Sequence, residues 1–281
     1  QENAEVFLAE SRHLNHPFVP MGVIQGWSPG SMAKAALNLV KMGYDYLALG
    51  GMATSTIENI EIVLGEIRKD IPAYVKLHLL GFGKIDQIEK ILPYGVESLD
   101  TTSPMLRAFK DPKTSFFMLQ DNGIKYYHSI RIPQATENRG LKTLVQKGLF
   151  TQEFLIQQEQ DALHALREFD QGKQSADDTL KIVMEYVKST LTNSNSGSPP
   201  TLSKIQSVRN DYLDLLNDRP WKICDCAVCK KISIEVIIFR ASNRNKRRGM
   251  HNTWVVNKLL KILERRGSYN EKDNQVSRDQ S

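Results

Sequence analysis

Three cysteines in the C-terminal part of the chain have the spacing of a metal site. Cys224, Cys226 and Cys229 are its only cysteines, and His251 follows 22 positions after the last of them. Three thiolates and an imidazole form the tetrahedral ligand set that a structural zinc ion prefers, and four protein ligands leave no position for a catalytic water. The alternatives are three incidental buried cysteines, or an iron–sulfur cluster that lacks a fourth cysteine. We predict a structural Zn²⁺ site in a reducing, cytoplasmic environment.

An aspartate stands at the end of a short apolar run. Asp100 follows Val96–Leu99 and precedes the segment Thr-Thr-Ser-Pro. If the run is a parallel strand of a barrel, the carboxylate points into the mouth where chemistry is done, as a nucleophile or a base. An aspartate in this context is also a common helix N-cap or turn residue. On these residues alone both interpretations stand.

Other run ends carry residues that suit a flat polar ligand. Gly50 and Gly51 lack side chains, so a planar group could lie against the backbone, although a simple turn also explains them. Gln25 is either a solvated loop residue or a two-point amide partner for a heterocycle. His78 lies inside an apolar run, and we interpret it as a hydrogen-bonded histidine of a barrel interior rather than a ligand.

The basic excess lies mostly in the C-terminal part. Lys and Arg number 37 against 32 Asp and Glu, a net charge of +5, which is compatible with a nucleic-acid partner and with many plain enzymes. We predict that segment 240–248 is a turn whose basic side chains hold phosphates, and a solvated turn is the alternative. The predicted contacts are Arg244, Lys246, Arg247 and Arg248.

A repeated strand–helix pattern over residues 18–100 must position these residues. Four units about 25 residues apart are typical of parallel βα architecture. Ser55 with Glu58 predicts a capping box at the second helix. The predicted strands are Phe18–Ile24, Tyr46–Leu49, Tyr74–Leu80 and Val96–Leu99, and the predicted helices are Ser31–Met42, Thr56–Lys69 and Ile85–Leu92.

Small or polar strand ends favour a (β/α)8 barrel over a doubly wound sheet, and four strands make half of one. The predicted fold class is α/β: the C-terminal half of a (β/α)8 TIM barrel with a helical insertion and a zinc-binding C-terminal subdomain. Helical periodicity covers 141–147, 151–169, 177–191, 205–216 and 254–265, and 232–239 is strand-like. The predicted domains are the barrel half at 1–110, the insertion at 111–220 with a flexible loop at 192–200, the zinc subdomain with the basic turn at 221–267, and a disordered tail at 268–281.

The chain has no run of 18 apolar residues, so we expect no membrane-spanning helix. It begins Gln-Glu-Asn-Ala, which is neither a start methionine nor a signal peptide. Together with the pattern of only four strand–helix units and the family resemblance described next, this start leads us to expect the C-terminal portion of a longer protein, inactive and poorly stable by itself.

Five motifs, in order, resemble the second half of the tRNA-guanine transglycosylase family, over about residues 18–107 and 221–255. They are Gln25-Gly26, Leu49-Gly50-Gly51-Met52-Ala53, Leu79-Leu80-Gly81-Phe82-Gly83, Leu99-Asp100, and the cysteine motif with its distal histidine. The resemblance implies a zinc-containing glycosyltransferase that replaces guanine in a polynucleotide with a 7-deazaguanine. It matches Asp100 to the nucleophile, the cysteines and His251 to the zinc ligands, and Gln25, Gly50, Gly51, Met52, Leu80 and Gly81 to the base pocket.

Two segments depart from the tRNA enzymes. Thr101–Lys110 replaces a Cys-Val-x-Pro-Thr-Arg type of continuation, and the histidine lies within the basic segment Arg244–Asn252. Both features resemble the DNA-acting branch, which inserts a 7-deazaguanine such as preQ0 into DNA. We therefore expect a DNA substrate, with tRNA in the queuosine or archaeosine pathway as the alternative.

Base exchange with retained stereochemistry needs two displacements, so Asp100 would hold the sugar covalently. The second acidic residue and the acidic residue that reads the base precede the Gln25 motif in the family and are not placed here. A catalytically incomplete, zinc-stabilised nucleic-acid-binding module is the alternative from another class. A homodimer is one possible oligomeric state.

Overall fold

The chain folds into two compact units, Gln1–Ser103 and Pro104–Ser281. The computed structural model describes the backbone of residues 2–14, 18–121, 123–240 and 242–278, and side chains as far as residue 265 except that of residue 242. Among these residues no helix combines the length and the apolar character that crossing a bilayer requires.

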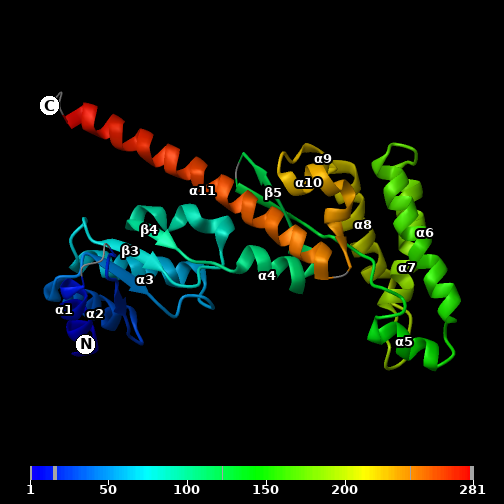
Figure 1. Ribbon diagram of the computed structural model, residues 1–281, viewed down its shortest axis with the longest axis horizontal. Helices are drawn as coiled ribbons and strands as arrows, with labels where there is room; N and C mark the ends of the chain where they lie inside the picture. Colours follow the sequence, from blue (N-terminus) through cyan, green and yellow to red (C-terminus); the bar gives the residue numbers. More distant parts are fainter. Residues whose placement is uncertain (1, 15–17, 122, 241, 279–281) are drawn as a thin grey trace. The chain divides into compact units, whose positions relative to one another are not determined.

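The N-terminal unit contains a sheet of four parallel strands that lie side by side in chain order (Figure 1). Each strand lies within a run that the sequence predicts. Parallel strands place their carboxyl ends at the same end of the sheet. Gln25, Gly50, Leu80 and Asp100 each follow a strand, so they lie along this carboxyl edge, formed by the four strand ends. The strands are β1 (Gly22–Ile24), β2 (Tyr46–Leu49), β3 (Lys76–Leu79) and β4 (Val96–Leu99).

The helices after β1 and β2 begin at short polar residues. α2 (Pro29–Met42) starts with a capping box at Ser28. α3 (Ile57–Asp70) is capped by Thr56, whose Oγ1 accepts a first-turn N–H, and not by Ser55 as the sequence predicts. The N-cap therefore falls one residue later than the predicted capping box.

The segment between β3 and β4 differs from the predicted helix. The sequence predicts a helix over 85–92, and the structure has two 3-10 helices, Ile85–Lys90 and Leu92–Tyr94. Pro93 disfavours α-helical geometry at the residue before it, which shortens the helix here. A further helix, α1 (Glu2–His13), precedes the sheet.

The two faces of the sheet differ. One face packs against α2, which in turn packs against α3, and its residues Ile24, Leu47, Leu49, Leu77 and Leu79 are almost fully buried. The opposite face carries the alternate residues, among them Tyr46, His78 and Ser98, and it leaves Val23 49% exposed. The polar side chains of the sheet therefore gather on the face away from these helices.

The C-terminal unit opens with strands where the sequence predicts a helical insertion. After α4 (Ser103–Lys110), strands β5 (Phe116–Gln120) and β6 (Gly123–Tyr127) form an antiparallel hairpin. The aromatic residues of both runs favour strand, and Gly123 has a φ of 123°, which glycine adopts readily. The next α-helix begins at Arg139.

Four helices then follow, close to the predicted positions. Each begins at an Asn, Ser or Thr whose side-chain oxygen accepts a first-turn N–H. They surround a core in which Phe169, Tyr186 and Tyr212 are buried. Lys147 donates hydrogen bonds to two backbone carbonyls of the loop 192–200. The helices are α5 (Arg139–Gln146), α6 (Gln152–Asp170), α7 (Ala176–Leu191) and α8 (Leu202–Asp218).

The cysteine-bearing segment comes next. The predicted strand over 232–239 is mostly 3-10 helix. Val236, Ile237 and Ile238 are buried in succession, a pattern that does not separate a fully buried strand from a buried helix. Only its last two residues form a strand, parallel to β7 (Ile130–Arg131). The elements are α9 (Pro220–Ile223), α10 (Ala227–Ile232), the 3-10 helix Ser233–Ile237 and β8 (Ile238–Phe239).

The last helix, α11 (Ser242–Arg278), is longer than predicted. The basic segment 240–248, predicted as a turn, is helical from Ser242, because Arg and Lys are good helix formers. The helix continues through most of the predicted tail 268–281, since an existing helix adds one hydrogen bond per residue. Residues 279–281 lie outside the described part.

Candidate metal centre and candidate active site

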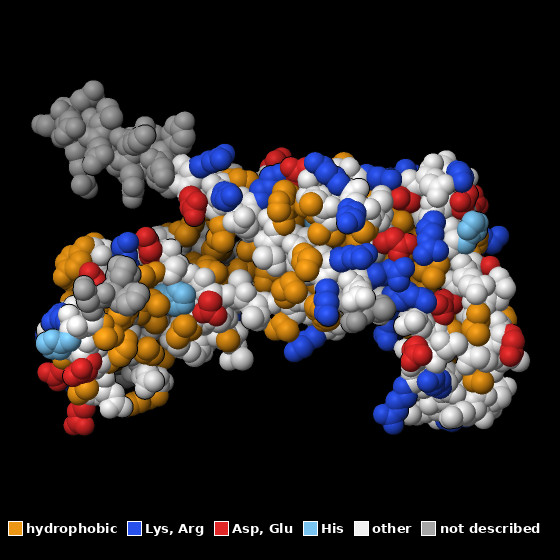
Figure 2. Space-filling model, in the orientation of Figure 1, with side chains coloured by type: hydrophobic (Ala, Val, Ile, Leu, Met, Phe, Trp, Pro, Cys, Tyr) orange, Lys and Arg blue, Asp and Glu red, His pale blue; other side chains and the backbone are white. Residues whose placement is uncertain are grey.

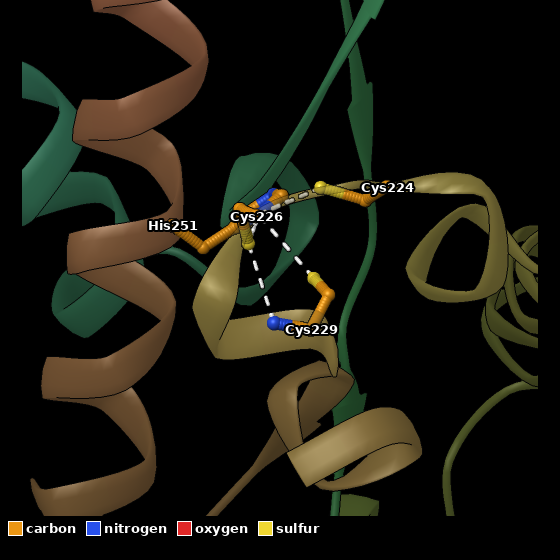
Figure 3. A group of neighbouring side chains, drawn as sticks. All are labelled: Cys224, Cys226, Cys229 and His251. Atoms are coloured by element: carbon orange, nitrogen blue, oxygen red, sulfur yellow. Dashed lines mark hydrogen bonds between the residues drawn. The ribbon is translucent and has the colours of Figure 1, made fainter. Parts of the chain in front are cut away.

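The four predicted metal ligands come together in the C-terminal unit (Figure 3). Their ligand atoms all lie within 4.8 Å of one another, and all four residues are buried. Nδ1 of His251 lies 3.6, 3.4 and 3.4 Å from the Sγ atoms of Cys224, Cys226 and Cys229. Tetrahedral bonds of about 2.3 Å to sulfur and about 2.1 Å to nitrogen would separate these atoms by about 3.6 Å. The spacing therefore fits a tetrahedral metal ion.

Several elements hold the cluster in place. Cys224 follows α9, and Cys226 caps α10, where its Sγ accepts the N–H of Cys229 at 3.2 Å. His251 comes from α11, and its Nε2 lies 2.7 Å from the carbonyl oxygen of Phe117 in β5. Because a carbonyl only accepts, Nε2 carries the proton and Nδ1 is left to bind a metal.

Hydrogen bonds within the cluster shift the pKa values of its members. A hydrogen bond with Cys229 lowers the pKa of Cys224 to about 4, and the same bond raises the pKa of Cys229. Burial opposes the charged form of His251, but hydrogen bonds with Cys224 and Cys226 outweigh it and raise its pKa to about 9. A divalent cation binds thiolates and neutral imidazole, so it would replace this proton sharing. The donor set fits zinc.

In the N-terminal unit, Asp100 is held by one carboxylate oxygen. Its Oδ1 accepts the N–H of Gly81 at 3.0 Å and lies 3.3 Å from Nε2 of His78. The side chain is 58% exposed. The first-turn N–H of Ser103 binds Thr101 Oγ1 instead. The carboxylate is therefore not used as a helix cap.

Further polar side chains continue from Asp100 across the sheet. Nδ1 of His78 lies 2.5 Å from Ser98 Oγ, which lies 2.5 Å from the hydroxyl of Tyr46. His78 is hydrogen-bonded, as its sequence context predicts, but its contact with Asp100 was not predicted. The signal was present in the two-residue alternation of strands, because Ser98 and Asp100 point to the same face.

The predicted base-pocket residues lie mostly along the same strand edge. Gln25 is exposed after β1, and Gly51 has a φ of 78° with open space where a Cβ would be. Leu80 is 37% exposed. Met52 is buried and offers little surface to a ligand. Gly50 follows β2, and Gly81, with a φ of 69°, follows Leu80.

The four predicted phosphate contacts differ in their surroundings. Lys246 and Arg247 are exposed, and Arg244 forms an ion pair with Glu235 at 2.5 Å. Arg248 is fully buried and donates to the carbonyl oxygens of Ala108, Val236 and Ile238. Arg248 is thus a structural residue, which corrects the prediction for it. Figure 2 shows Lys and Arg side chains along the C-terminal unit, including where α11 begins.

Comparison with known proteins identifies relatives of two kinds. The chain is 34% identical over 264 residues to a DNA-guanine transglycosylase of Salmonella montevideo, a match that covers 94% of this chain and 60% of that protein. It is 29% identical over 98 residues to a queuine tRNA-ribosyltransferase of Thioalkalivibrio sulfidiphilus (strain HL-EbGR7), covering 34% and 26% respectively. No family model matches the chain. The chain spans less than two thirds of the length of these curated relatives.

Proposed function

We propose that this chain, which is a relative of the DNA-guanine transglycosylases, exchanges guanine in DNA for a 7-deazaguanine base such as preQ0. The relative named for DNA matches at higher identity and over far more of the chain than the relative named for tRNA. The observation that carries the proposal is the exposed Asp100 carboxylate at the carboxyl edge of the sheet, with both of its hydrogen bonds on Oδ1.

In the proposed reaction a carboxylate oxygen of Asp100 attacks C1′ of the deoxyribose. The C1′–N9 bond breaks, and guanine leaves with a proton from a general acid to which we assign no residue. N9 of the incoming base then attacks C1′, the ester bond to Asp100 breaks, and the N9 proton passes to the conjugate base of the same general acid, which restores it. Two displacements on opposite faces retain the configuration at C1′.

The sheet of the N-terminal unit would be half of a (β/α)8 barrel. Its strand order follows the chain without reversal, as in a barrel, whereas a doubly wound sheet reverses its order at a switch point. The face with Tyr46, His78 and Ser98 would be the barrel interior. A planar base extruded from the DNA stack would then lie over Gly50 and Gly51, next to Gln25, Leu80 and Gly81, with Met52 beneath.

The C-terminal unit would contribute the zinc site and contacts to the polynucleotide. Zinc held by the three cysteines and His251 would supply folding energy and no chemical step, because all four positions are taken by protein. Lys246 and Arg247 are the exposed side chains that we assign to phosphates, with Arg244 beside them in its ion pair. Such contacts add affinity without sequence preference.

The test is exchange of a labelled 7-deazaguanine into duplex DNA and, separately, into tRNA, measured in a protein that contains this chain together with the general acid, because we expect this chain by itself to be inactive. We expect incorporation into DNA, and a loss of about 10³-fold or more in Asp100→Asn. Mass spectrometry of the denatured reaction should find DNA esterified to the peptide that contains Asp100. Glu97→Gln, which removes an exposed carboxylate from β4 that pairs with Lys76, is the matched control and should exchange normally.

The outcomes separate the alternatives. Exchange into tRNA and not into DNA would show that the substrate is tRNA. Binding of nucleic acid without exchange, equal in wild type and Asp100→Asn, would favour a zinc-stabilised binding module. Normal exchange by Asp100→Asn would refute Asp100 as the nucleophile.

A further inference from the structure

We propose that His78 is a positioning residue that selects which oxygen of Asp100 attacks the sugar. The inference rests on the proposed function of Asp100 as a nucleophile. Two donors converge on the same oxygen, Oδ1: the N–H of Gly81 at 3.0 Å and Nε2 of His78 at 3.3 Å. Oδ2 takes part in neither bond, and is the oxygen left to attack C1′.

With a neutral imidazole, the hydrogen bonds around His78 have one consistent direction. The Asp100 carboxylate can only accept, so Nε2 of His78 must carry a proton. In the neutral imidazole, Nδ1 is then an acceptor, and Ser98 Oγ must donate to it across 2.5 Å. Ser98 Oγ in turn accepts from the hydroxyl of Tyr46 at 2.5 Å. Tyr46 and Ser98 therefore fix the tautomer of His78 that holds Asp100.

A second donor matters because a carboxylate rotates easily. The terminal torsion of aspartate is broad and roughly two-fold, so a single backbone hydrogen bond leaves the two oxygens free to exchange places. Donors from β3 and from the turn that follows it fix the carboxylate plane together. A misplacement of about 1 Å can reduce a rate about 100-fold, and we expect an effect of this order from His78.

The first experiment measures the tautomer directly and does not depend on activity. Two-dimensional NMR of ¹⁵N-histidine in the full chain should show His78 protonated at Nε2 and bare at Nδ1, with the signal assigned by its loss in His78→Gln. Ser98→Ala should shift the Nδ1 resonance. A neutral His78 with its proton on Nδ1 and a bare Nε2 would overturn the proposal.

The second experiment tests whether base exchange needs the hydrogen-bond donor that His78 supplies. Glutamine can place an N–H near the position of Nε2, so His78→Gln should retain most of the base-exchange rate, whereas His78→Leu should lower kcat about 10- to 100-fold with little change in KM. His164→Leu, an exposed histidine on α6, is the matched control and should exchange normally.

Each result decides something. Wild-type exchange by His78→Leu, or equal losses in His78→Leu and His78→Gln, would overturn the proposal while leaving Asp100 as the nucleophile. A wild-type protein that contains the general acid and still exchanges no base would instead contradict the proposed function. The tautomer of His78 would then decide by itself whether this histidine holds Oδ1.

Discussion

His251 and Phe117 lie 134 positions apart and are joined by a 2.7 Å hydrogen bond from the imidazole Nε2 to the backbone carbonyl oxygen. The next residue, Asn252, accepts the N–H of Phe117 and donates to the carbonyl oxygens of Pro104 and Ser115. A metal ligand is thus part of the contact between β5 and α11. Metal binding and the packing of these two elements should be coupled.

The first prediction concerns metal removal. Protein purified without a chelator should contain one zinc ion per chain, and Cys229→Ser or chelation should abolish it and lower the thermal unfolding midpoint, because structural zinc contributes folding free energy. Hydrogen exchange in β5 and in α11 around His251 should then accelerate. Asp225→Asn, an exposed neighbour of two ligands, should retain the metal. Substoichiometric zinc in the wild type would refute the site.

A second prediction separates the two neighbouring arginines of α11. Arg248→Met would leave the carbonyl oxygens of Ala108, Val236 and Ile238 without their donor, and should lower the free energy of unfolding by about 3 kcal/mol or more. Arg247→Met, at an exposed position, should change it by less than about 0.5 kcal/mol. Urea unfolding measures both, and equal effects would contradict the structural role of Arg248.

A third prediction concerns DNA binding by the exposed basic side chains of α11. Lys246→Ala and Arg247→Ala should weaken DNA binding similarly for all sequences and should each reduce the slope of log K against log salt concentration by about 1. Fluorescence anisotropy over a range of salt concentrations measures this slope. Lys69→Ala, an exposed lysine of α3 paired with Glu66, is the control. An unchanged slope in both variants would place the phosphate contacts elsewhere.

Local sequence signals predicted much of the fold. The four parallel strands and the helices of the C-terminal unit follow from apolar runs, periodicity and Ser, Thr or Asn caps, all of which are local. The β5–β6 hairpin was missed, although Asn-Gly between two aromatic runs is a strong hairpin signal. The start of α11 was missed because its dense positive charge indicated a solvated turn, whereas Asn245, Arg248 and Asn252 form a buried polar stripe at helical spacing.

In the candidate sites, too, local motifs predict some residues, and only the fold reveals others. The metal ligands are predictable because Cys-x-Cys-x-x-Cys is rare and specific. The partners of Asp100 are not, because His78 lies on the neighbouring strand and Gly81 in the turn after it, and only the parallel register brings them next to Asp100. The protonated side of His251 depends on the carbonyl oxygen of Phe117, which no sequence motif records.

A further prediction concerns Gly81, whose N–H binds Asp100 from a backbone with a φ of 69°. Gly81→Ala strains this conformation by about 1 kcal/mol and brings a Cβ to 3.4 Å from that of Ala53. The turn should shift, and base exchange should fall by about 10-fold or more. Gly148→Ala, at a φ of 71° with open space around it, should show the strain in its unfolding free energy and no loss of exchange.

The last prediction concerns stability in acid and rests on Glu235. Burial opposes its charged form, but hydrogen bonds from Arg167 and Arg244 outweigh burial and hold its pKa below the ordinary value of 4.5. The unfolded chain therefore binds the proton more readily, so this stabilisation is complete above about pH 4.5 and is lost as the pH falls through the lower folded-state pKa.

Glu235→Gln should accordingly lower the free energy of unfolding by about 1.5 to 3 kcal/mol at pH 7, and the difference from wild type should shrink in stronger acid. Any acid-induced loss of metal affects both chains and cancels in the comparison. Glu185→Gln, which breaks an exposed pair with Lys188, should cost less than about 1 kcal/mol at pH 7. A difference for Glu235→Gln that stays constant down to pH 3 would show that its two arginines do not stabilise the carboxylate.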